Sequence, residues 1–324
     1  MAERASIFTT AQIAVEVTPG TNPAASYKQL SALMIEPGVK VEIESYRGSG
    51  QKFPTVAALN KEWTESKLSG PITYTEIVYL LSSLVSYAAP TGTPGKIWVF
   101  EPGLTTASVV KTFSIEQGDA TRAHSFTYGV VKDLTLKFGR DGCDLDGTMI
   151  GRALTDGITK TAGATVIAPQ VVMPTQVSVK LADTQAGLAG ASALTRVIST
   201  QWSMADRFGP VWALDATTYP AATVETEPKV ELKLKVQADA AGMGLLTNMR
   251  AGTTKFMRIE ATGALISGAD YHKITIDTAC KVMDVTPFED ADGVFAVEWT
   301  MNGFYDSTWT KTSEVTVINS LATL

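Results

Sequence analysis

Apolar and polar residues alternate along much of this chain, and the alternation predicts β-strands. Residues 12–17, 39–46 and 176–181 largely alternate apolar and polar side chains. This period of two is typical of a strand that buries one face. Only residues 73–84 and 239–249 have the spacing of a helix, and Thr73 with Glu76 has the sequence of a capping box. The pattern therefore predicts a mainly β fold with two short helices.

The predicted elements occur twice in the same order. Residues 12–17 and 176–181 match in pattern at an offset of 164 residues, and the Leu80–Leu81 and Leu245–Leu246 pairs match at 165. A fixed order of matches is the signature of an internal duplication. The remaining matched pairs are 39–46 with 196–204, 63–68 with 230–236, 113–116 with 257–260, and a closing strand–acidic turn–strand unit in each series.

The offset between matches defines the expected domains. It falls to 144 residues at Ile115 and Ile259, which indicates an insertion in the first copy near residues 86–106, where prolines and glycines cluster. We expect a first domain over 1–154, a linker over 155–174 that is rich in Gly, Ala and Thr, and a second domain over 175–324. Each domain would be a β-sandwich or partial barrel with one helix.

Composition excludes several classes of function. The 324 residues have a net charge of −6 and a sequence pI near 5.1, whereas proteins that hold nucleic acid carry clustered Lys and Arg. Two cysteines are too few for a disulfide framework. The N-terminus lacks a signal-peptide pattern, and the longest apolar run, near 77–89, is too short for a membrane helix. We expect a protein that folds in the cytoplasm and has no membrane partner.

No pattern predicts a catalytic, cofactor or metal site. The two histidines, His124 and His272, are far apart in sequence, and no HExxH, CxxC, GxSxG or P-loop spacing occurs. Residues 141–147 contain three aspartates, but the glycine and glutamate positions of a calcium loop do not fit, so a hairpin turn is favoured. We expect a protein that is not an enzyme.

Two long loops are the predicted functional segments. Residues 47–59 follow a strand of the first copy, and residues 205–224 occupy the matching position in the second. Both contain an aromatic residue beside basic ones, a combination favoured at protein interfaces, although a mobile surface loop has the same composition. Trp309, in the C-terminal arm after Asp306, is a further candidate contact. The candidate assembly residues are Arg47, Gln51, Lys52, Phe53, Arg207, Phe208 and Trp309.

The sequence resembles the tail tube proteins of long-tailed bacteriophages. The resemblance rests on the opening QIAVEVTPGT (12–21), on KLSG (67–70) before the first helix, and on YGVVKDLTL (128–136). A duplicated unit and the insertion near 86–106 depart from the family pattern. The resemblance implies two tandem tube-type domains, and three chains would then supply the six domains of one ring.

The same resemblance implies a function and a location. Rings would stack through the long hairpins, with the N-terminal arm (1–8) and the C-terminal arm as straps, and enclose a negatively lined conduit for DNA. The chain would bind other copies of itself, a tail terminator and tail-tip or tape-measure proteins, and DNA only in transit. It would lie in the virion tail after assembly in the host bacterial cytoplasm. The alternatives are a virion-associated β-sandwich adhesin that binds carbohydrate through exposed tryptophans, or the tube of a contractile injection machine.

Overall fold

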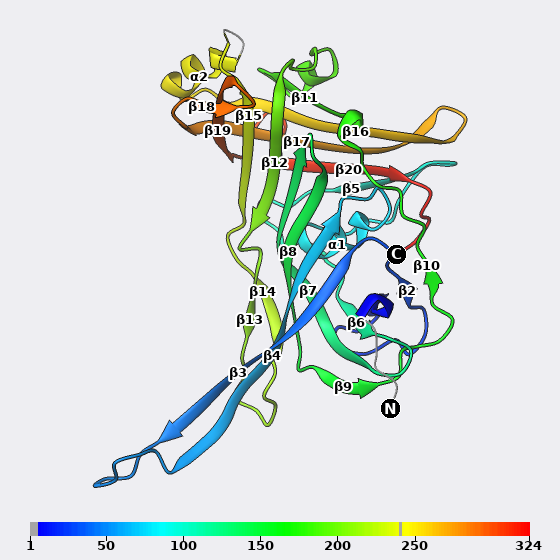
Figure 1. The fold of residues 1–324 in the computed structure, drawn as a ribbon, viewed down its shortest axis with the longest axis vertical. Helices are drawn as coiled ribbons and strands as arrows, with labels where there is room; N and C mark the ends of the chain where they lie inside the picture. The colour runs from blue at the N-terminus through cyan, green and yellow to red at the C-terminus, as the bar shows by residue number, and fades with distance from the viewer. Residues whose placement is uncertain (1–5, 240–241) are drawn as a thin grey trace.

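The fold is mainly β, as the alternation predicts. The computed structural model describes residues 6–239 and 242–324, which form twenty strands and two α-helices (Figure 1). The predicted N-terminal arm over 1–8 lies partly outside the described residues; of it, Ser6–Phe8 form a 3-10 turn.

The first half of the chain contains eleven of these elements. They are β1 (Thr10–Val15), β2 (Lys28–Gln29), β3 (Met34–Tyr46), β4 (Val56–Pro71), α1 (Ile77–Leu84), β5 (Lys96–Phe100), β6 (Phe113–Gly118), β7 (Ala123–Gly139), β8 (Cys143–Gly151), β9 (Thr155–Ile158) and β10 (Thr165–Val166).

The second half contains the others. They are β11 (Val177–Ala182), β12 (Val197–Ala205), β13 (Phe208–Val211), β14 (Ala222–Glu225), β15 (Lys229–Gln237), α2 (Leu245–Ala251), β16 (Lys255–Ser267), β17 (Asp270–Val285), β18 (Glu289–Ala291), β19 (Val294–Gly303) and β20 (Ser313–Asn319).

The same set of antiparallel pairings occurs in both halves. In the first half β1 pairs with β6, β3 with β4, β4 with β8, β6 with β7, and β7 with β8. In the second half the corresponding pairs are β11 with β16, β12 with β15, β15 with β19, β16 with β17, and β17 with β19. α1 and α2 each follow the second strand of the first hairpin. These matched ladders support the predicted duplication.

A bulge fixes which residues of the two halves correspond. The β7–β8 ladder skips Lys132 between Val131 and Asp133, and the β17–β19 ladder skips Met283 between Val282 and Asp284. An extra residue at the same place in both ladders makes Lys132 and Met283 equivalent.

The opening strands match at a different offset from the one expected. The shared bulge makes Gly129 correspond to Cys280, so Phe113, opposite Gly129, corresponds to Lys255, opposite Cys280. The next residues, Ser114 and Phe256, lie opposite Ala14 and Ala182, which gives an offset of 168 residues and not 164. A shift by an even number of residues keeps every side chain on the same face of a strand, so the alternation cannot reveal it.

One ladder joins the two halves into a continuous sheet. β7 of the first half pairs antiparallel with β12 of the second, from Leu134 opposite Met204 to Gly139 opposite Ser199. We call this ladder the β7–β12 junction. Through it the strands run in the order β3, β4, β8, β7, β12, β15, β19 and β17.

The C-terminal segment is part of the fold and not a free strap. β20 pairs with β17 on one side and with β5 on the other, and its Val315 and Val317 are buried. β5 lies inside the insertion predicted near 86–106, so the insertion supplies the strand that pairs with β20 near the end of the chain (Figure 1). The prediction of a C-terminal inter-ring strap is wrong for these residues, because both edges of β20 are already paired.

The segment expected to be a linker packs on the first half. β9 pairs with β7, β10 pairs with β2, and Ile167 and Val172 are buried. Residues 155–174 therefore cover the first half instead of separating two independent units.

Helix α1 is held by a buried carboxylate. The Thr73 hydroxyl accepts a hydrogen bond from the Glu76 N–H at 3.0 Å, which is half of the predicted capping box. The Glu76 side chain does not complete the box. It accepts the N–H groups of Ser31 at 2.6 Å and Leu33 at 2.7 Å, and so fixes the chain that leads into β3.

We expect Glu76→Ala to lower the free energy of unfolding by about 2 to 4 kcal/mol, because buried N–H groups lose their acceptor. Urea denaturation at low protein concentration measures this change. Glu227→Ala, at an exposed position, is the control and should change stability by less than about 0.5 kcal/mol. Equal effects of the two substitutions would show that the Glu76 contacts contribute nothing.

Candidate functional site

The hairpin of β3 and β4 projects from the body of the protein (Figure 1). We call residues 39–62 the arm. On one face of β3, Val39, Val41 and Ile43 are 50–60% exposed, and they continue the row that begins with buried Ile35. Apolar residues at alternate positions normally face a core. The arm thus carries the pattern of a buried strand beyond the body of the protein, where residues 39–60 are exposed, while its base at Lys61 and Glu62 meets the second loop.

The predicted tip residues of the first loop lie together at the end of the arm. Arg47, Gln51, Lys52 and Phe53 are all exposed, with Phe53 at 68%. The Lys52 ammonium lies 5.7 Å from the centroid of the Phe53 ring. Their position suits a contact with another molecule, and that role stays a prediction.

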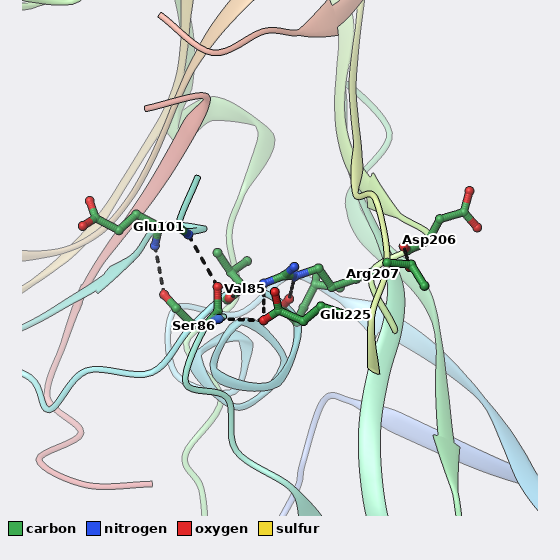
Figure 2. Close-up of polar contacts among 10 residues, drawn as sticks. Val85, Ser86, Glu101, Asp206, Arg207 and Glu225 are labelled. Carbon is green, nitrogen blue, oxygen red and sulfur yellow. Dashed lines mark hydrogen bonds and ion pairs between the residues drawn. The ribbon is translucent and has the colours of Figure 1, made fainter. Parts of the chain in front are cut away.

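Arg207 is buried, contrary to the prediction for the second loop. Its side chain is 3% exposed and donates to the carbonyl oxygens of Leu84 at 3.0 Å and Val85 at 3.3 Å (Figure 2). It also binds the Ser108 hydroxyl at 2.8 Å and the Glu225 carboxylate at 3.2 Å. Arg207 therefore ties the second half to the C-terminal end of α1 and cannot serve a projecting hairpin.

Phe208 is buried as well, so its predicted role is also wrong. It packs with Val130 and Ile150 of the first half. The rest of the loop follows the same course: Trp212 meets Trp63 edge to face at 5.7 Å, and Thr218 accepts the Glu62 N–H at 2.6 Å. The physical reason is burial of apolar and aromatic surface, which favours folding the second loop back onto the first half.

Trp309 packs inside its own half of the chain. Its ring is half-buried and lies edge-on to Phe256 at 5.9 Å, in a small cluster with Leu188 and Ala279. The prediction that Trp309 is a free anchor for another subunit is therefore not supported.

The open sheet edges were not identified from the sequence. β3 pairs only with β4, and the last residues of β17, from Lys281 to Val285, pair only with β19 among the described strands. An unpaired edge presents free N–H and C=O groups and is a template for a further strand. These edges belong to the two terminal strands of the run that crosses the β7–β12 junction.

The polar face of the sheet carries charges of both signs. Lys61 pairs with Glu42 at 2.9 Å, Lys137 with Asp146 at 2.5 Å, and Lys235 with Glu289 at 2.8 Å. The Lys61 ammonium, which donates to Glu42, lowers the pKa of that carboxyl. Exposed pairs of this kind add little stability. They place positive and negative side chains next to each other on this face.

The described residues contain no group of three His, Cys, Asp or Glu side chains that could hold a metal ion. His124 lies at the start of β7 beside Asp156, and His272 lies near the start of β17 against the Tyr74 ring. Burial lowers the pKa of His272.

Neither described helix has the length and apolar sequence of a membrane span. No protein-family model matches the chain, and no curated protein matches it.

We expect Arg207→Ala to lower the free energy of unfolding by about 3 kcal/mol, because carbonyl groups and a carboxylate lose a buried cation. Arg47→Ala, at the exposed tip of the arm, should change it by less than about 0.5 kcal/mol. Urea denaturation of both variants, compared at equal m-values, tests the difference. A destabilising Arg47→Ala with a neutral Arg207→Ala would contradict the assignment of the two arginines.

Proposed function

We propose that the chain is a structural subunit of a phage tail tube and polymerises as stacked rings. One observation carries the proposal: the two halves join edge to edge at the β7–β12 junction, and the matching outer edges on β3 and β17 have no partner strand in the described chain. A head-to-tail repeat of the junction between chains would use both edges. Such a heterologous contact closes into a ring when its rotation allows.

Closure would solve the problem that open edges present. Exposed strand edges favour aggregation, and a closed barrel has none. If the junction within the chain and the junction between chains have the same geometry, three chains supply six halves. Barrels of about 16 to 18 strands already enclose a water-filled channel, so a ring of about 24 strands could admit a DNA duplex.

The two faces of the sheet suit a conduit. The polar face would line the channel, and the apolar face packs on the helices and the remaining strands. The paired charges of Lys137 with Asp146 and Lys61 with Glu42 give this lining mixed charge. The overall charge of −6 is thus not concentrated on the proposed lining as a uniform negative surface. Weak attachment to DNA would follow from the balance of signs.

The partners proposed with this function are further copies of the chain, a tail terminator and tail-tip or tape-measure proteins, with DNA in transit. The carbohydrate-binding alternative has less support, because Trp98, Trp202 and Trp299 are fully buried. Trp63 and Trp212 are half-buried and contact each other edge to face.

A ring should contain three chains. Native mass spectrometry and negative-stain microscopy of the purified protein at high concentration should find particles of three copies, about 34.5 kDa each, with rings or tubes in the images. Rings of six whole chains would refute the equivalence of the two junctions. A protein that stays monomeric at all concentrations would refute the proposed function.

The tip of the arm should be needed for stacking but not for folding. Replacing residues 47–55 by Asn-Gly, which favours a tight hairpin turn, should preserve the far-UV circular dichroism spectrum and the urea midpoint. Single rings should form, while long tubes decrease at least about tenfold in number, as counted by microscopy, since a lost contact of about 1.4 kcal/mol changes an equilibrium tenfold. Tubes of normal length would show that the arm tip has no role in stacking.

A further inference from the structure

The two helices differ in a way that the repeat does not explain. All eight residues of α1 are buried, whereas in α2 only Leu245 is buried. α1 packs on β7 and α2 packs on β17, so the two helices occupy matching places. The difference is that β7 has a partner strand, β12, beyond it, whereas the end of β17 has none among the described strands.

The chain that follows β12 also covers α1. Arg207, two residues beyond the end of β12, binds the carbonyl oxygens of Leu84 and Val85 at the end of this helix (Figure 2). No described residue after β3 does the same for α2 within one chain, because β3 lies at the opposite end of the sheet. α2 packs on β17, the strand whose last residues have an open edge, so a strand added at that edge would lie near α2.

The repeat gives the register of the missing contact. Reading across the ladders from the shared bulge, Leu134 and Asp133 of β7 correspond to Val285 and Asp284 of β17. The same correspondence extends through the neighbouring strands, where Thr64 of β4 is equivalent to Val230 of β15. Val39 lies opposite Thr64 and Met204 lies opposite Val230, so Met204 corresponds to Val39, and Ala205 corresponds to Lys40. At the β7–β12 junction, Leu134 lies opposite Met204.

We propose that β3 of one copy pairs antiparallel with the end of β17 of the next copy, with Val39 opposite Val285 and Lys40 opposite Asp284. This inference rests on the proposed function, and it specifies the partner strands and their register. Lys40 and Asp284 are both exposed and lie on the polar face, so the register brings opposite charges together. A slip of one residue would put Val39 on the polar face.

Burial supports the same register. Val39 is 50% exposed in the single chain, whereas its equivalent Met204 is 0% exposed at the β7–β12 junction. Pairing in this register would place Val39 in the corresponding buried position, on the side of the sheet where α2 lies. It would also satisfy the backbone groups of both open edges.

Paired cysteines test the register directly. In Lys40→Cys/Asp284→Cys, opposite residues of adjacent antiparallel strands would have Cα atoms about 4.5 to 5.5 Å apart, which suits a disulfide. The native thiols do not compete, because burial raises the pKa of Cys143 to about 11 and of Cys280 to about 12. Oxidation should convert most of the assembled protein into covalent dimers and trimers on a non-reducing gel. Each single-cysteine variant should stay largely monomeric.

Glu36→Cys/Asp284→Cys is the matched control, four residues away on the same face of β3. If tubes form and this control links better than the Lys40 pair, or neither pair links, the register is wrong although the function stands. If no rings form at any concentration and no pair links, the proposed function fails with it.

Charge reversal provides a second readout. Lys40→Asp or Asp284→Lys alone should raise the protein concentration needed for assembly about tenfold, since like charges would face each other in every copy. Lys40→Asp/Asp284→Lys should restore assembly to within about threefold of the natural chain. Urea midpoints equal to that of the natural chain establish that all three variants fold. A double variant no better than the single variants would overturn the pairing of these two residues.

Discussion

The backbone ladder between β7 and β12 is the contact on which the rest of the structure depends. It joins the run β3, β4, β8 and β7 to the run β12, β15, β19 and β17, and leaves β3 and the end of β17 as the outer edges of the combined run. On the apolar face of this ladder the side chains of Leu134, Leu136, Trp202 and Met204 are 0% exposed, so hydrogen bonding and apolar burial act at the same place. Without it the second loop would have no surface to fold onto, and Arg207 would lose its contacts with Leu84, Val85 and Ser108 of the first half.

This ladder also explains why one loop is an arm and its counterpart is not. The segment after β12 begins at the junction, so its apolar residues Phe208 and Trp212 find Val130, Ile150 and Trp63 of the first half within reach. β3 lies at a free edge, and the loop after it, residues 47–55, is exposed. The exposed Val39, Val41 and Ile43 of β3 are apolar surface of the same kind without a partner in this chain, which is the basis for proposing a second copy as that partner.

The sequence predicts local structure well here and long-range structure only in part. Alternation locates β1, β3, β11 and β15, because one buried face per strand imposes a period of two. β20 carries the same signal at Val315 and Val317, and β5 is a short apolar run, KIWVF, inside the predicted insertion.

Partner choice is what alternation leaves open. The pairing of β20 with β5 joins residues more than 200 positions apart, and period two says nothing about which strands pair. The tip residues Arg47 and Phe53 are exposed as predicted, whereas Arg207 and Phe208 are buried. An aromatic residue beside a basic one occurs both at the exposed tip and in the buried loop, so composition does not distinguish them. The strand pairing next to each loop determines whether it is exposed or buried.

The proposed ring would not have six identical junctions. Within a chain the two halves are joined twice, by β7 with β12 and by β20 with β5, whereas α2 runs into β16 without an inserted strand that could take the place of β5. A junction between chains would have the β3–β17 ladder and the arm but no counterpart of the second ladder. Because the second half has no equivalent of the insertion, strong and weaker junctions would alternate around the ring. The duplication would thus preserve the sixfold spacing of the sheet while confining reversible assembly to three of its six contacts.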